Sequence, residues 1–159
     1  MKLKLPHTIP QKVLEGLTIG ILLLQFLLPV LLWNRLPDPM PTHYNAAGEI
    51  DGWGSRWTVF LTPGISLAMW ALLSLVTRLD PKHWNMPFPV PYGREVPVYS
   101  AVKTTLTAMK LEMMIIFAGV EAVTVTGAGR WIGLATALPC VAMAVTLIAG
   151  MVIAYRRRY

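Results

Sequence analysis

Long apolar blocks constrain this chain more than any other feature, because a helix of about 20 apolar residues has the length that crosses a bilayer. Four blocks of roughly this length are separated by polar segments rich in Pro or Gly. Only 14% of the residues are charged, whereas soluble domains carry about 25%. We predict a single integral membrane domain over residues 1–159, an all-α four-transmembrane-helix bundle. The predicted spans are about 13–33, 58–76, 113–128 and 131–155.

The distribution of Lys and Arg predicts how this bundle is oriented. The leader, the segment from Arg78 to Lys103 and the tail hold ten of them, while the first loop (34–57) and the last turn hold three. Cytoplasmic loops carry the excess of Lys and Arg. We therefore expect both termini and loop 79–98 to be cytoplasmic, and loop 34–57 to face outward. The basic residues form no continuous face, so we expect no nucleic-acid partner despite a net charge of +6.

Local signals predict where the third helix begins and how its charges are placed. Ser100 is the predicted N-cap of a long helix that starts in water near Lys103 and enters the membrane near Met113. Lys110 is expected to extend its ammonium group toward the cytoplasm. Cys140 is the single cysteine and lies in an apolar block, which excludes an intramolecular disulfide.

The first loop combines turn-forming and charged residues, and three interpretations stay open. Its glycines and the side chains of Asn45 and Asp51 favour an ordered cap closed by local hydrogen bonds, with an Asp51–Arg56 ion pair. His43 with one of the loop acids offers nitrogen and oxygen ligands for a divalent metal. The loop acids are Asp38, Glu49 and Asp51. The third interpretation is recognition of a ligand or partner by His43, Asn45, Gly48, Asp51, Ser55 and Arg56.

The loop also carries the pattern Pro-x-His-x-Asn-x-x-Gly-x-x-Asp-x-x-x-Ser-Arg. This pattern resembles the signature of a small bacterial membrane domain of unknown function that forms the N-terminal part of SdpI-like immunity proteins. The resemblance covers the first two spans and their loop. The best-known member of that family protects a cell from a peptide toxin made by its siblings, and it sequesters a repressor at the membrane. The resemblance thus implies the bacterial cytoplasmic membrane, a peptide toxin or another membrane protein as partner, and no catalytic residues. The matching positions are Pro41, His43, Asn45, Gly48, Asp51, Ser55 and Arg56.

One acidic side chain stands near the middle of the third span. Glu121 is there, and an ionised carboxylate at such depth is costly and usually marks a pathway or a specific partner. We expect a protonated carboxyl group bonded to Gln25, which lies in the middle of the first span. Glu121 is then either a structural link between helices or part of a transport pathway.

Small residues predict where helices approach each other. Gly16 and Gly20 form a Gly-x-x-x-Gly pair in the first span, and Ala142 and Gly150 offer a small face in the fourth. Such residues let helix backbones come close within a membrane. We expect them to pack within one chain, with a homodimer seam as the alternative.

These features favour a binding or protective membrane protein over an enzyme. The sequence shows no nucleophile with a base, no phosphate-binding loop and no paired metal ligands, and we expect no cofactor. The expected partners are the lipid bilayer and a peptide toxin or another membrane protein. The alternatives are a small transporter or transporter subunit that uses Glu121, and a membrane metal-binding protein that uses His43 with Asp51.

Overall fold

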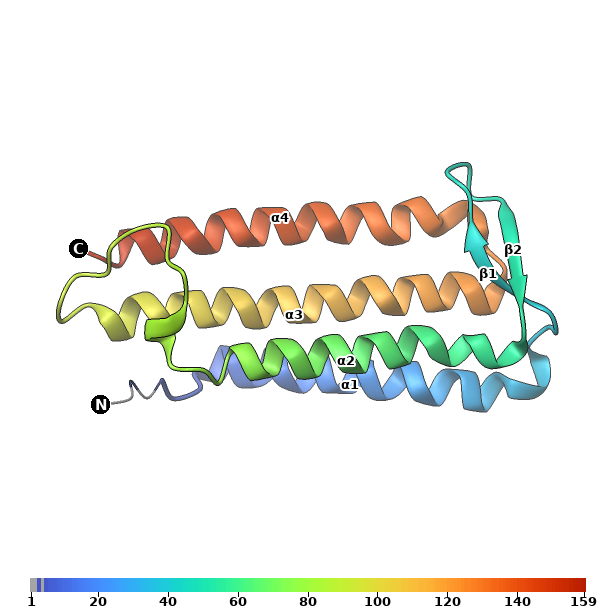
Figure 1. Ribbon diagram of the computed structural model, residues 1–159, viewed down its shortest axis with the longest axis horizontal. Helices are drawn as coiled ribbons and strands as arrows, with labels where there is room; N and C mark the ends of the chain where they lie inside the picture. Colours follow the sequence, from blue (N-terminus) through green and yellow to red (C-terminus); the bar gives the residue numbers. More distant parts are fainter. Residues whose placement is uncertain (1–2, 4) are drawn as a thin grey trace.

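The computed structural model describes residues 3 and 5–159, and it combines long helices with one small hairpin (Figure 1). Lys2 and Lys4 of the predicted leader lie outside the described residues. The helices are α1 (Ile9–Leu32), α2 (Leu61–Val76), α3 (Glu95–Thr126) and α4 (Ile132–Arg156). Strands β1 (Met40–Tyr44) and β2 (Ile50–Gly54) form an antiparallel pair between α1 and α2. We call this side of the molecule the hairpin end, and the opposite side, where α1 begins and α4 ends, the terminal end (Figure 1).

Three helical segments are long and apolar enough to cross a membrane, each consisting of a helix and an adjoining 3₁₀ turn. They are Ile9–Arg35, Arg56–Val76 and Gly129–Arg156. Large apolar side chains such as Leu23 and Ile148 are about two thirds exposed on their outer faces, and an exposed apolar surface of this extent is typical of contact with lipid. The structure thus indicates a membrane protein and confirms three of the predicted spans as candidates. The predicted span 113–128 belongs to α3, which is not among these segments.

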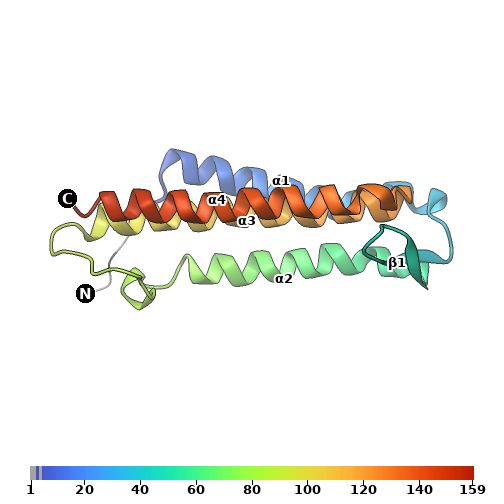
Figure 2. The same ribbon diagram turned by 90° about the horizontal axis from the view of Figure 1, so that it is seen from above.

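Helix α3 occupies the centre of the arrangement and packs against each of the other three helices (Figures 1 and 2). Figure 2 shows α1 and α2 on opposite sides of α3, diverging toward the terminal end. Lys103, Lys110 and Glu121 of α3 are all less than 5% exposed. The most polar helix, α3, is therefore surrounded by the three more apolar helices. This arrangement keeps the charged groups of α3 away from lipid.

The first helix begins four residues before the predicted span. Thr8 is its N-cap, because the Thr8 hydroxyl accepts from the Gln11 backbone N–H and the Gln11 side chain accepts from the Thr8 N–H. This reciprocal capping box satisfies two backbone donors that a helix start leaves free. The cap, rather than the first apolar residue, determines where α1 begins.

The predicted start of α3 at Ser100 was wrong, because the helix begins at Glu95. Pro97 stands within its first turn, where a missing backbone N–H costs no hydrogen bond. The loop predicted for 79–98 therefore ends before Glu95, and residues 95–98 belong to α3. Lys103 was expected to lie in water, yet it is only 4% exposed and its ammonium group donates to the Leu5 carbonyl oxygen at 3.0 Å.

Small residues mark a close helix approach at one of the predicted places. A Cβ atom at Gly150 of α4 would lie 2.0 Å from the Thr105 hydroxyl oxygen of α3, so this contact lies within one chain, as predicted. The prediction for Gly16 and Gly20 was wrong, since a Cβ atom at either meets nothing within 4 Å. These glycines lie on the exposed side of α1, and Ala142 is likewise exposed.

Candidate functional site

The hairpin between α1 and α2 is closed by side chains that bond to its own backbone. The Asn45 amide oxygen accepts from the backbone N–H groups of Ala47 and Glu49, at 2.9 and 3.0 Å. Gly48 adopts φ +81°, a left-handed conformation that favours glycine. Ser55 caps the next 3₁₀ turn by accepting from the Trp57 N–H. Asn45, Gly48 and Ser55, predicted as recognition residues, therefore serve the local fold.

An exposed pair of side chains crosses the hairpin. The His43 Nδ1 and Asp51 Oδ1 atoms lie 2.5 Å apart, and the two side chains are 71% and 45% exposed. β1 and β2 bring them together because His43 is in register with Gly52, the residue after Asp51. Trp53 on the same strand is 57% exposed. Imidazole, carboxylate and indole groups are thus available together on the hairpin surface.

The predicted Asp51–Arg56 ion pair does not form. Arg56 instead lies over the Trp33 ring, 5.4 Å from its centroid, and its Nε atom is 3.8 Å from the Asp38 carboxylate. The reason is geometric: Asp51 stands in β2, whereas Arg56 begins the 3₁₀ turn that follows and faces the end of α1. Trp33 also contacts Trp57 and Phe60, so Arg56 belongs to an aromatic cluster where the first two helices meet.

The predicted metal site gains no third ligand. His43 and Asp51 contact each other, but residues 3 and 5–159 contain no group of three or more His, Cys, Asp or Glu side chains that could hold a metal ion. Asp38 pairs with Arg56, and the Glu49 carboxylate accepts from the Asn45 amide at 3.0 Å. The other loop acids therefore have partners away from the His43–Asp51 pair.

The hairpin rests on the turn between α3 and α4. A Cβ atom at Gly129 would lie 2.4 Å from the Gly48 carbonyl oxygen and 2.7 Å from the Tyr44 ring, so two backbones touch here without space for a side chain. The Tyr44 hydroxyl donates to the Val123 carbonyl oxygen at 3.5 Å, and burial raises the pKa of this phenol. Met40, the first residue of β1, is fully buried and clusters with Leu36 and Val59. The hairpin is thus an ordered part of the fold that covers one end of α3.

A second set of polar groups lies inside the helices. The residues of α1 that face inward include Gln11, Thr18 and Gln25, spaced seven residues apart, so they follow one side of the helix. Ser66 and Ser74 of α2 and Lys110 and Glu121 of α3 are also buried. We call this set the polar interior.

Lys110 connects three helices within the polar interior. Its side chain is fully buried, and its ammonium group lies 2.5 Å from the Glu15 carboxylate of α1 and 3.1 Å from the Ser74 hydroxyl of α2. The expectation that Lys110 extends toward the cytoplasm was wrong, because a carboxylate on the neighbouring helix lies within reach. A charge in an apolar environment is retained when it is paired and hydrogen-bonded.

Gln25 and Glu121 do not form the predicted pair. The Gln25 amide oxygen accepts from the Ser66 hydroxyl at 2.6 Å, and its nitrogen donates to the Met114 carbonyl oxygen at 3.3 Å. Glu121 is 2% exposed, and its Oε1 atom has no hydrogen-bond partner among the described residues. Gln25 therefore links α1, α2 and α3, and Glu121 is a buried acid without a fixed partner for that oxygen.

Several of these residues escaped the sequence interpretation. Glu15 lies within the predicted span 13–33, and Ser66 and Ser74 lie within the predicted span 58–76, but no feature of the sequence singled them out. The seven-residue spacing of Gln11, Thr18 and Gln25 was a usable signal for the inward side of α1, and Glu15 lies close to that stripe. Their partners on α2 and α3 could not be predicted in this way. The spacing of polar residues within α1 shows which side of α1 faces inward, but it does not show which residues of the other helices lie opposite.

Exposed apolar helices around a polar interior define a small helical membrane protein with an ordered hairpin at one end. Within this class, residues 20–67 match the model of a family described as "Domain of unknown function (DUF1648)". The match covers the second half of α1, the hairpin and the start of α2. It therefore includes all the residues of the loop pattern.

One relative shares part of this sequence. An "Uncharacterized protein" of Archaeoglobus fulgidus is 34% identical over 74 residues, which are 46% of this chain and 40% of the archaeal protein. The aligned part of this chain thus spans well under half the length of that relative. No solved structure matches. The similarity is to a domain and to a protein whose descriptions state no activity.

Proposed function

We propose that this protein is a membrane-embedded binding protein whose hairpin recognises a partner outside the membrane, in a protective role like that of the SdpI-like immunity proteins. The observation that carries the proposal is the exposed His43–Asp51 pair on an otherwise anchored hairpin. An exposed contact between two polar side chains contributes little to stability, so these side chains are available for contact with a partner. The exposed Trp53 beside them adds an aromatic group, a residue type that often dominates binding energy.

The proposal includes a topology with four spans and both termini in the cytoplasm. Two properties of α3 support a fourth span: its 32 residues exceed the about 20 that a helix needs to cross a bilayer, and its buried charged groups lie among the other helices instead of facing lipid. The excess of Lys and Arg at the terminal end supports the orientation. Ser55 and Tyr92 are exposed at the two ends. In a Cys140→Ala background, an impermeant thiol reagent should label Ser55→Cys in intact cells and leave Tyr92→Cys unlabelled, and the reverse pattern would contradict the orientation.

Protection is tested in the source organism by deleting the gene and exposing cells to culture supernatant from their siblings. We expect the deletion to sensitise the cells, and the intact gene to restore resistance. Asp51→Asn and His43→Gln should be present in the membrane at normal levels and fail to restore resistance. Glu49→Gln is the matched control, because it removes the same charge from the same hairpin two residues away from Asp51. Equal growth of the deletion strain and the parent would contradict the protective role.

Transport is the second candidate function, and the unpartnered Glu121 carboxyl oxygen favours it. A buried acid without a fixed partner for one oxygen is free to exchange a proton or contact a substrate. Purified protein in liposomes with an imposed pH gradient should then show a proton flux that disappears in Glu121→Gln. Unchanged flux in that variant, or none in the parent protein, would contradict this candidate and leave the binding proposal untouched.

A further inference from the structure

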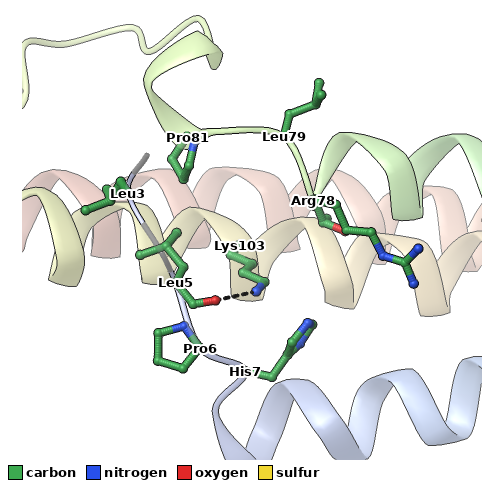
Figure 3. A pocket seen from close by; sticks show the side chains of 9 residues that line it. Leu3, Leu5, Pro6, His7, Arg78, Leu79, Pro81 and Lys103 are labelled. Carbon is green, nitrogen blue, oxygen red and sulfur yellow. Dashed lines mark hydrogen bonds between the residues drawn. The ribbon is translucent and has the colours of Figure 1, made fainter. Parts of the chain in front are cut away.

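Two adjoining cavities open at the terminal end, between α1, α2 and α3 (Figure 3). They measure about 570 and 470 Å³ and share walls formed by His7, Thr77 and Arg78. Figure 3 shows His7, Arg78 and Lys103 reaching the first cavity from three different segments of the chain. The second cavity extends from there along α1 and α2, where these two helices diverge (Figure 2). We call the two cavities together the terminal cleft.

Positive charge in the terminal cleft exceeds negative charge. Lys12, Arg78 and Lys103 line it, and Glu15 is the one acid in its walls. The Glu15 carboxylate is already paired with Lys110, which does not line either cavity. Within residues 3 and 5–159, neither Lys12 nor Arg78 forms an ion pair. The cleft therefore has cationic groups that no acid of the described chain neutralises.

One neighbouring group records this charge in part. The pKa of His7 is lowered, first by burial and then by the positive charge of Lys103, with Lys110 and Lys12 adding to it and Glu15 opposing it. The contribution of the three lysines to this shift is the effect expected of a positive field, and such a field favours an anion.

The remaining walls are apolar. Leu3, Leu5 and Leu79 line the first cavity, and Ile19 and Trp70 line the second. The indole N–H of Trp70 has no acceptor among the described residues. Because the second cavity lies between helices that are apolar enough to cross a membrane, its apolar part lies at the depth of lipid chains. A ligand that fits the terminal cleft has an anionic head and an apolar tail.

We propose that the terminal cleft binds an anionic phospholipid of the surrounding leaflet, with its phosphate group between Arg78, Lys12 and Lys103 and one acyl chain along Ile19 and Trp70. Arg and Lys side chains recognise phosphate oxygens through charge-assisted hydrogen bonds, and basic pockets between membrane helices are suited to lipid headgroups. The inference depends on the membrane placement of α1 and α2 and is independent of what the hairpin recognises.

The headgroup is tested by native mass spectrometry of the purified protein in neutral detergent, with phosphatidylglycerol or phosphatidylcholine added. We expect selective binding of phosphatidylglycerol, weakened at least about tenfold by the double variant Lys12→Gln/Arg78→Gln. The matched control is Arg35→Gln/Arg130→Gln, which removes the same charge from exposed positions at the hairpin end. Equal weakening in both double variants, or equal binding of the two lipids, would overturn the proposal.

The acyl chain is tested with glycines that tolerate a side chain. A Cβ atom at Gly16 or Gly20 meets nothing within 4 Å, and Gly16 lines the second cavity whereas Gly20 does not. Gly16→Leu should therefore weaken phosphatidylglycerol binding, and Gly20→Leu should leave it unchanged. Inorganic phosphate is the third probe. If phosphate alone raises the melting temperature as much as phosphatidylglycerol does, or if both Leu variants bind the lipid normally, the cleft is not a lipid site.

Discussion

The hairpin and the polar interior use similar polar residues in opposite surroundings. The hairpin pairs His43 with Asp51 at the surface, where both side chains are largely open to solvent. The polar interior pairs Lys110 with Glu15 across α1 and α3, and the Lys110 side chain is fully buried. Water screens the first pair and solvates either partner if the other is lost. Lys110 has no such access to water, so its ammonium group depends on Glu15 and on the Ser74 hydroxyl.

This difference shows which polar groups stabilise the fold and which are available to bind a partner. Buried pairs connect helices that apolar packing alone aligns only loosely, because lipid chains are as apolar as the helices themselves. Exposed pairs on the hairpin add little stability. The structure of the hairpin comes from backbone contacts, such as that between Gly48 and Gly129. Substitutions in the two regions should therefore differ in size and in what they affect.

The largest effect is expected from breaking the Lys110–Glu15 pair. Glu15→Leu leaves the buried ammonium group with the Ser74 hydroxyl as its remaining partner, and we expect a loss of about 3–5 kcal/mol in the free energy of unfolding. The double variant Glu15→Leu/Lys110→Met removes both charges and should recover most of that loss. Unfolding of the purified protein in mixed micelles, followed by circular dichroism, measures both. If Glu15→Leu is as stable as the parent protein, the Lys110–Glu15 pair does not stabilise the fold.

The contact between the hairpin and the α3–α4 turn should give the next largest effect. Gly129→Ala places a methyl group against the Gly48 carbonyl oxygen and the Tyr44 ring, and relieving such overlap typically costs about 1–3 kcal/mol. Gly133→Ala is the matched control, since a Cβ atom there meets nothing within 4 Å. Proteolysis of the hairpin should accelerate in Gly129→Ala alone. Similar cleavage rates in both variants would contradict the proposed anchoring.

A smaller and opposite pair of effects is expected at Gln25 and Glu121. Gln25→Leu breaks the links to Ser66 and Met114 and should destabilise by about 1 kcal/mol. Glu121→Leu removes a buried oxygen that lacks a partner, so we expect unchanged or increased thermal stability. If Glu121→Leu destabilises more than Gln25→Leu, Glu121 has a structural partner in the membrane that this chain does not supply.

The exposed hairpin pair should give almost no effect on stability. Asp51→Asn is expected to change the free energy of unfolding by less than about 0.5 kcal/mol, although it should abolish protection. Circular dichroism melting in detergent, run beside the protection assay, separates the two results. A large loss of stability in this variant would show that Asp51 has a structural role instead of a role in recognition.

The smallest effect concerns His7 and depends on pH. Burial and nearby lysines lower its pKa below the ordinary value of 6.5, so the folded protein favours the neutral imidazole. The unfolded chain then binds a proton first as the pH falls below 6.5, and the folded state loses stability until the pH is below the lowered pKa. His7→Gln should make this part of the pH dependence disappear from melting curves recorded between pH 5 and 7, about the range in which histidine titrates. An identical pH profile in the variant would contradict the lowered pKa of His7.

The sequence by itself determined the membrane class, the positions of the apolar helices and the ordered loop between the first two. These features follow from local properties: apolar length decides which segments can enter lipid, and turn-forming residues such as Asn45 and Gly48 close a hairpin through bonds to their own neighbours. Cap residues could have improved the helix boundaries, since Thr8 and Gln11 form a capping box that is visible as a sequence pattern.

Only the tertiary structure decided which polar groups meet. Lys110 pairs with Glu15, Gln25 with Ser66, and Arg56 lies on Trp33. The sequence instead predicted Glu121 as the partner of Gln25, Asp51 as the partner of Arg56, and a Lys110 side chain directed toward the cytoplasm. The helical period shows which side of one helix faces inward, but the rotation and axial shift of the neighbouring helix remain free until side chains pack. For the same reason the terminal cleft was invisible in the sequence, because its walls come from segments that are far apart along the chain and adjacent only after α1, α2 and α3 assemble.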